Sequence, residues 1–218
     1  MLDDSTNAFS RAVPDASEPA AFRYPERPLV RRHSPHGYAD YASFRPWLRD
    51  EFSFRCVYCL VREQWGRLTG EFDLDHFVAQ ELEPAKVVVY ENLLYACRTC
   101  NLRKGRHQIP DPAAHFTTAS IRVYPDGTLA GMTAQAERIV HLLCLNSTAF
   151  KRWRRMWVRI VELAAEHDPA LHRELMGYPQ DLPDLSACRA SKNTRQAGIE
   201  QSHFARRQRG ELAETYLS

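Results

Sequence analysis

Two Cys-x-x-Cys pairs constrain this chain more than any other feature of its sequence. The pairs are Cys56–Cys59 and Cys97–Cys100, and 37 residues separate Cys59 from Cys97. Each pair forms a tight turn that offers two thiolates, and the intervening loop can bring the two turns together around one ion. The spacing therefore predicts a tetrahedral four-cysteine site for a structural zinc ion.

The segment between and just after these pairs carries donors of a different chemistry. Acidic and apolar residues alternate over residues 71–77, which is typical of a short strand, and this strand includes the dipeptide Asp75-His76. Asn92 precedes an apolar stretch, and Asn101 directly follows the second cysteine pair at the start of a basic, helical turn. Hard cations prefer oxygen donors and zinc accepts thiolates, so we expect two separate metal sites.

Residues 52–107 resemble the HNH endonuclease family in its four-cysteine zinc subtype. The cysteine pairs, the Asp-His dipeptide and the two asparagines follow the order and approximate spacing of that family. The resemblance implies an α+β protein with a ββα-metal (His-Me finger) HNH core and structural zinc knuckles. A small hairpin and an α-helical C-terminal region would follow this core. The implied activity is metal-dependent hydrolysis of DNA phosphodiester bonds.

The resemblance also implies a role for each matching residue. His76 would be the general base that takes a proton from the attacking water. Asp75 would bind a catalytic Mg²⁺ or Mn²⁺ ion, and Asn101 would be the second protein ligand, at a position where the family often has His. Asn92 would orient the histidine through the backbone, and Lys104 would lie near the scissile phosphate.

The chemistry of phosphodiester hydrolysis favours the same residues. A neutral histidine can act as a base near pH 7 because its unperturbed pKa is about 6.5. The alternative is a non-catalytic zinc module that binds nucleic acid or a protein partner, in which Asp75, His76 and Asn101 are incidental. A purely structural module does not need these three residues together, so the endonuclease is the favoured hypothesis.

The chain is nearly neutral, with a formal net charge of +2, so any binding to nucleic acid has to come from local basic patches. One patch follows the second cysteine pair. Another lies between Lys151 and Arg159, where five basic residues occur without an acidic one. We expect contacts with DNA, and less readily with RNA, through Arg103, Lys104, Arg106, Arg152 and Arg155.

The composition divides the chain into four expected regions. They are a flexible or loosely docked arm (1–40), the HNH nuclease domain with its zinc site (41–118), a hairpin with helices (119–184) and a polar, basic tail (185–218). In the third region, residues 121–129 carry a Pro-Asp-Gly turn typical of a hairpin, and residues 134–145 and 148–166 have helical patterns. A stripe at helical spacing predicts the core face of the second helix, namely Phe150, Trp153, Trp157, Ile160 and Ala164.

Other features indicate the setting in which the protein works. No apolar run approaches 18 residues, and the amino terminus lacks the pattern of a secretory signal, so we expect no membrane span. Four of the six cysteines lie in the knuckles, which favours metal binding in a reducing compartment, and hence a cytoplasmic protein. HNH proteins of this size with an added helical region resemble nuclease subunits of bacterial anti-phage systems, which implies a possible ATPase or other protein partner.

Overall fold

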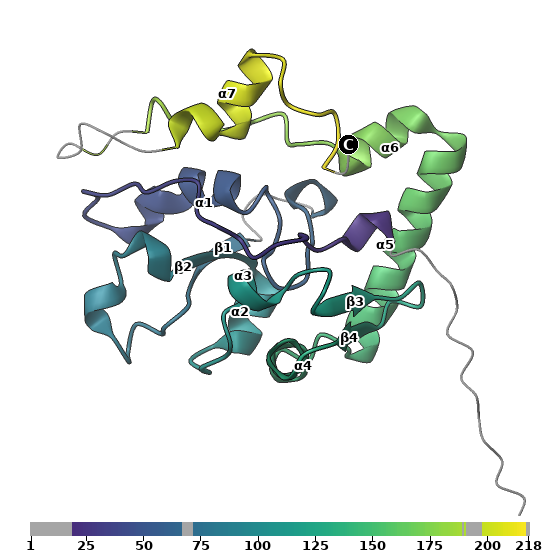
Figure 1. The fold of residues 1–218 in the computed structure, drawn as a ribbon, viewed down its shortest axis with the longest axis horizontal. Coiled ribbons are helices and arrows are strands. Elements are labelled where there is room, and N and C mark those ends of the chain that lie inside the picture. The colour runs from purple at the N-terminus through teal and green to yellow at the C-terminus, as the bar shows by residue number, and fades with distance from the viewer. Residues whose placement is uncertain (1–18, 67–71, 189, 191–197, 217–218) are drawn as a thin grey trace, which may run out of the picture.

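The computed structural model describes residues 19–66, 72–188, 190 and 198–216, and it has a mixed α+β fold with two small antiparallel sheets (Figure 1). The first sheet pairs β1 (Phe72–His76) with β2 (Leu93–Cys97), and Asp75 lies opposite Leu94. Helix α2 (Arg98–Lys104) follows β2 without a loop and packs against both strands. The predicted strand therefore forms, and its last residues lie beside this helix.

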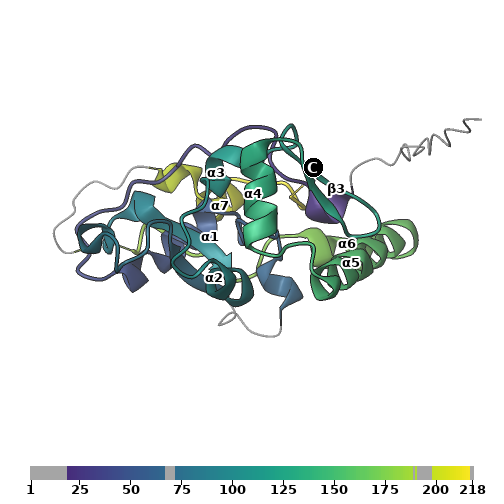
Figure 2. The same ribbon diagram turned by 90° about the horizontal axis from the view of Figure 1, so that it is seen from below.

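The remaining elements surround this sheet and helix, as Figures 1 and 2 show from two directions. They are α1 (Arg45–Glu51), α3 (Pro112–His115), the hairpin of β3 (Ile121–Val123) and β4 (Leu129–Gly131), α4 (Ala134–Leu142), α5 (Thr148–His167), α6 (Pro169–Met176) and α7 (His203–Gln208). The predicted hairpin and both predicted helices form, and α4 ends at Leu142 rather than at residue 145. Among the described helices, none combines the length and apolar character needed to cross a membrane.

Within the predicted stripe of α5, Ala164 is buried and Phe150, Trp153 and Trp157 pack partly buried against the core, but the most buried face also takes in Arg154. The buried residues of the helix are Arg154, Val158, Val161 and Ala164. The guanidinium of Arg154 donates hydrogen bonds to the carbonyl oxygens of Gly127 and Leu145. Buried carbonyl groups need donors, so this arginine belongs to the core and not to the predicted basic surface.

The segment that precedes α1 packs against the core. The ring of Phe22 lies edge-on between Trp65 and Trp153, with centroid distances of 5.3 and 5.6 Å. The hydroxyl of Tyr24 donates a hydrogen bond of 2.9 Å to the carbonyl oxygen of Tyr58, beside the first knuckle. The arm expected over residues 1–40 is thus docked from residue 19 onward, and residues 1–18 lie outside the described residues.

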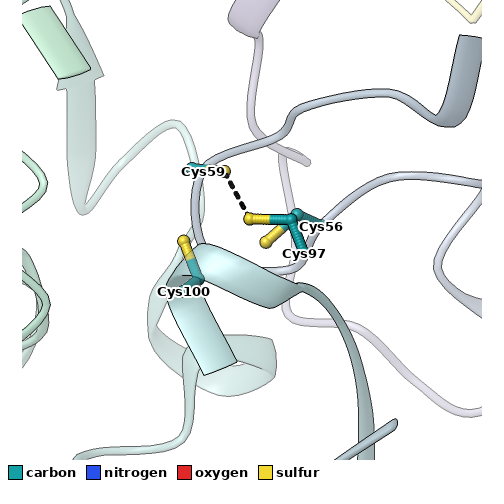
Figure 3. Close-up of side chains that lie close together, drawn as sticks. All are labelled: Cys56, Cys59, Cys97 and Cys100. Atoms are coloured by element: carbon teal, nitrogen blue, oxygen red, sulfur yellow. Dashed lines mark hydrogen bonds between the residues drawn. The ribbon is translucent and has the colours of Figure 1, made fainter. Parts of the chain in front are cut away.

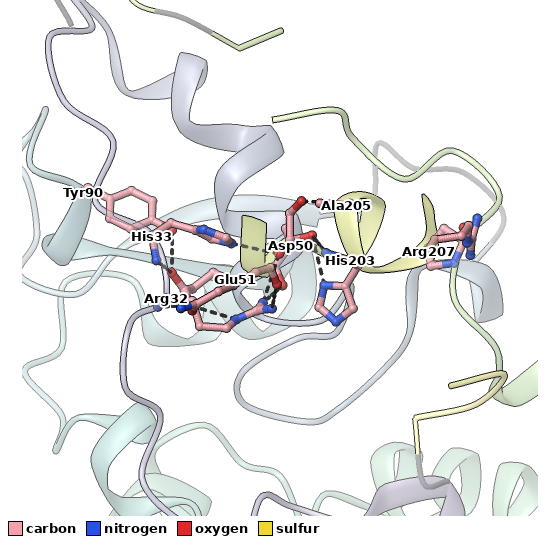
Figure 4. A network of polar contacts seen from close by, with 11 residues as sticks. Arg32, His33, Asp50, Glu51, Tyr90, His203, Ala205 and Arg207 are labelled. Atoms are coloured by element: carbon pink, nitrogen blue, oxygen red, sulfur yellow. Dashed lines mark hydrogen bonds and ion pairs between the residues drawn. The ribbon is translucent and has the colours of Figure 1, made fainter. Parts of the chain in front are cut away.

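A buried polar cluster joins this segment and the C-terminal region to α1 (Figure 4). The fully buried carboxylate of Asp50 accepts a hydrogen bond of 2.9 Å from Nε2 of His33 and one of 2.8 Å from the backbone N–H of His203. The guanidinium of Arg32 lies 3.1 Å from the same carboxylate. Residues 198–216, expected as part of a tail, are therefore anchored by α7 to the core.

The charge state of this cluster makes stability depend on pH. Burial alone would raise the pKa of Asp50, but its contacts with His203 and His33 outweigh burial and hold the pKa well below its usual value. Burial also lowers the pKa of His203, so the fold favours its neutral form. Both groups have depressed pKa values in the folded state, so their stabilising contribution is present at neutral pH. The His203 part is lost as pH falls below about 6.5, and the Asp50 part below about 4.

We expect Asp50→Asn to lower the free energy of unfolding at pH 7 by about 3 kcal/mol, because it removes the buried charge that Arg32, His33 and His203 contact. Urea unfolding between pH 4 and pH 8 measures this loss. Glu162→Gln, a neutralisation at an exposed position of α5, is the matched control and should behave as wild type. Equal stability of Asp50→Asn and wild type would show that the cluster does not hold the termini in place.

Candidate metal centre and adjoining polar cleft

The four knuckle cysteines converge on one point (Figure 3). All of their sulfur atoms lie within 4.8 Å of one another, and Sγ of Cys59 is 3.7 Å from Sγ of Cys97. A zinc–sulfur bond of about 2.3 Å places tetrahedral sulfur atoms about 3.8 Å apart. The predicted cluster is therefore confirmed, and its donors suit a zinc ion in number, type and spacing.

Local backbone structure explains why the thiols meet. In the first knuckle, the N–H of Cys56 donates to the carbonyl oxygen of Val61, and the chain turns at Leu60 with a φ of 57°. The second knuckle spans the junction of β2 and α2, where the first helical turn folds Cys100 back toward Cys97. Hydrogen bonds from the thiol of Cys100, and then from the other two, hold the pKa of Cys97 well below its usual value, which favours a thiolate.

His76, at the end of β1, is held at both ring nitrogens. Its Nε2 lies 3.0 Å from the carbonyl oxygen of Val87, which can only accept, so Nε2 carries the hydrogen. In the neutral ring Nδ1 then has the lone pair, and the amide nitrogen of Gln80 lies 3.0 Å from it. The ring of Tyr41 packs edge-on against the imidazole at 4.8 Å. The geometry therefore leaves Nδ1 as the basic nitrogen of His76.

The side chain of Asn92 forms hydrogen bonds with the loop that connects β1 to β2. Its side-chain oxygen accepts from the N–H of Val78 at 2.9 Å, and its amide nitrogen donates to the carbonyl oxygens of Val78 and Lys86. Lys86 directly precedes Val87, whose carbonyl binds His76. Asn92 thus fixes the loop that orients the imidazole and does not reach the cleft itself.

Asp75 is sealed between two side chains, which differs from the predicted arrangement. The hydroxyl of Tyr58 donates to its Oδ2 at 2.5 Å, and Nζ of Lys104 lies 2.9 Å from its Oδ1. Lys104 is itself buried and also donates to the backbone carbonyl oxygen of His76 at 2.6 Å. Burial raises the pKa of Asp75 despite the nearby ammonium, and a buried carboxylate needs such a counter-charge. Lys104 therefore points inward rather than toward a phosphate.

Asn101 contacts a carboxylate that sequence reasoning did not select. Its amide nitrogen donates to Oδ2 of Asp73 at 3.2 Å, and the guanidinium of Arg98 lies 3.5 Å from the other oxygen of Asp73. Residues i and i+2 of a strand share one face, so Asp73 lies on the same side of β1 as Asp75. That periodicity is the sequence signal that could have identified it.

These residues border a polar cleft of about 840 Å³. Of the predicted site residues, the cleft brings together His76, Asp75, Asn101 and Arg106. It also contains four residues that sequence reasoning missed, which are Asp73, Gln80, Arg45 and Arg98. A base, oxygen donors and arginines around one hollow have the chemistry to accept a phosphodiester.

The other predicted DNA contacts lie away from this cleft. Arg103 donates to the carbonyl oxygens of Leu143 and Cys144 and stacks over the ring of Phe150, so its guanidinium is engaged within the protein. Arg152 and Arg155 are exposed on α5. They form a surface that is separate from the residues lining the cleft.

No protein-family model matches this chain. A stretch of 97 residues is 29% identical to the Septu protein PtuB of Bacillus thuringiensis. The similarity covers 42% of this chain and 37% of PtuB, so the chain matches well under half of that relative's length. The relationship is therefore a distant homology to a Septu protein.

Proposed function

We propose that this protein is a metal-dependent endonuclease that hydrolyses DNA phosphodiester bonds, with His76 as general base, and that it takes part in anti-phage defence. The observation that carries the proposal is that His76 lines a cleft together with Arg45, Arg98 and Arg106, with its Nε2 on the Val87 carbonyl oxygen and its lone pair on Nδ1. The distant homology to a Septu protein supports the defence role. A partner protein, such as an ATPase, belongs to the same proposal.

The imidazole environment suits a general base. The attacking water gives its proton to Nδ1 of His76, and the carbonyl oxygen of Val87 stabilises the resulting imidazolium through the Nε2 hydrogen. Asn92 keeps this carbonyl in place by holding the preceding residue. The arginines of the cleft offset the negative charge that grows on the phosphoryl oxygens.

The oxygen donors of Asp75 and Asn101 suit a hard cation such as Mg²⁺ or Mn²⁺. When bound, this cation would supply positive charge beside the phosphoryl oxygens. To bind it, Asp75 has to release Oδ1 from Lys104, and Asn101 has to turn its amide oxygen into the cleft. Lys104 freed in this way could then approach the substrate phosphate.

The first proposed contacts with the DNA phosphates lie at the cleft. Arg106 is exposed at its edge, and Arg98 is exposed beside Asp73. Arg152 and Arg155 are proposed as further phosphate contacts on α5, because both are exposed and no acidic residue lies between them in the sequence. Arg103 and Lys104 would contribute only after leaving their present partners.

A second candidate function rests on the sealed carboxylate. If Asp75 and Lys104 remain paired, the zinc knuckles organise a module that binds nucleic acid or a protein partner without cleaving it. Hydrolysis needs a loosely held divalent cation, and binding alone does not. A chelator can remove that cation selectively, because thiolate-bound zinc is held far more tightly.

Incubation with supercoiled plasmid separates the two functions. We expect nicked and linear products in Mg²⁺ or Mn²⁺ and none after addition of EDTA, while circular dichroism shows that the protein stays folded. Folded protein that binds DNA and leaves it intact with either cation would favour the non-catalytic module.

A further inference from the structure

We propose that Gln80 occupies the site of the attacking water, so that the general base is capped in the free protein and uncapped when substrate and water enter. This inference rests on the proposed role of His76. It adds a residue that the chemistry does not require but that controls access to the reacting nitrogen. Gln80 comes four residues after His76 and lies at the edge of the cleft.

The hydrogen-bond pattern fixes which end of the Gln80 amide faces the histidine. The carbonyl oxygen of Val87 accepts from Nε2, so Nδ1 of the neutral ring can only accept. The group at 3.0 Å from Nδ1 must then be the amide nitrogen of Gln80 and not its oxygen. The amide therefore uses the lone pair with which His76 would take a proton.

An attacking water needs that same lone pair. A general base lies within about 2.6–3.2 Å of the oxygen that it deprotonates, and the Gln80 amide nitrogen stands within this range. The amide and the water therefore exclude each other at Nδ1. The amide nitrogen marks where the water oxygen comes to lie when the base is free.

The cap can open without any change in the backbone. The turn that carries Gln80 is fixed, because the N–H groups of Leu82 and Glu83 both donate to the carbonyl oxygen of Ala79. Asn92 holds Val78 on the other side. The Gln80 side chain itself is exposed, so a change of its rotamer moves the amide off the ring.

The step that follows balances in atoms and charge. The water gives one proton to Nδ1, and its oxygen forms the new bond to phosphorus. The bond from phosphorus to the leaving strand's oxygen breaks, that oxygen takes a proton from solvent water, and the imidazolium of His76 later returns its proton to solvent. Gln80 gains and loses no proton, so it acts only by leaving or covering the position.

Gln80→Met tests the cap, because methionine keeps the length of the side chain and lacks the amide hydrogens. We expect the carbethoxylation rate of His76 by diethyl pyrocarbonate, measured by peptide mass spectrometry, to rise about 2–10-fold, the factor for one lost hydrogen bond. The exposed His141 serves as internal reference. With plasmid, kcat/KM should rise by a similar factor.

Glu81→Gln is the matched control, because it changes the neighbouring residue of the same cleft and leaves the amide on Nδ1. An unchanged carbethoxylation rate of His76 in Gln80→Met would overturn the cap, and so would a fall in kcat/KM. The modification rate requires no cleavage. If wild type failed to cut DNA, the proposed function would be wrong. The modification rates would still show whether Gln80 covers Nδ1 of His76.

Discussion

Replacement of Cys100 by alanine is expected to yield a protein that holds no zinc and does not fold stably. The Cys100 side chain is fully buried. The four-cysteine cluster joins the turn at Cys56–Cys59 to β2 and α2. Zinc binding to such thiolates contributes about 10–16 kcal/mol, which is comparable to the whole stability of a typical domain at about 5–15 kcal/mol. Metal analysis by mass spectrometry and circular dichroism of the soluble fraction measure both effects.

Cys144→Ala is the control, because Cys144 is exposed two residues after the end of α4 and lies outside the cluster. It should retain one zinc ion per chain and the wild-type spectrum. Wild-type protein that is folded and free of zinc would contradict the assignment of the four-cysteine centre.

The cluster and the strand could be predicted from the sequence because each depends on short-range spacing. The cysteine pairs specify two turns, and the alternation before His76 specifies β1. Pairings between distant residues left no comparable pattern. Asp50 and His203 are 153 positions apart, and only the folded chain shows that one carboxylate anchors α7.

The partner of Asp75 illustrates the same limit within the site. The sequence places a carboxylate before His76 and a lysine after Asn101, and either could face the cleft. Burial decides the outcome, because a buried carboxylate recruits the nearest cation and Nζ of Lys104 reaches it at 2.9 Å. Arg154 of α5 is similarly buried, because it donates hydrogen bonds to the backbone carbonyl oxygens of Gly127 and Leu145. The spacing of apolar residues along α5 does not predict these contacts.

His76→Ala is expected to lower the rate of DNA cleavage by about 10²–10⁴-fold, the usual effect of losing a general base. Its side chain contacts the Val87 carbonyl, Gln80 and Tyr41, and it contributes nothing to the four-cysteine centre. Zinc content and DNA affinity should therefore stay close to wild type. His107→Ala, at an exposed position after α2, is the matched histidine control and should cleave normally.

Cleavage of supercoiled plasmid by equal amounts of folded, zinc-containing wild type and His76→Ala, in Mg²⁺ and with increasing time, decides whether His76 is the general base. We expect nicked and linear DNA with wild type and His107→Ala, and intact DNA with His76→Ala over the same period. Cleavage by His76→Ala at the wild-type rate would mean that another group is the base.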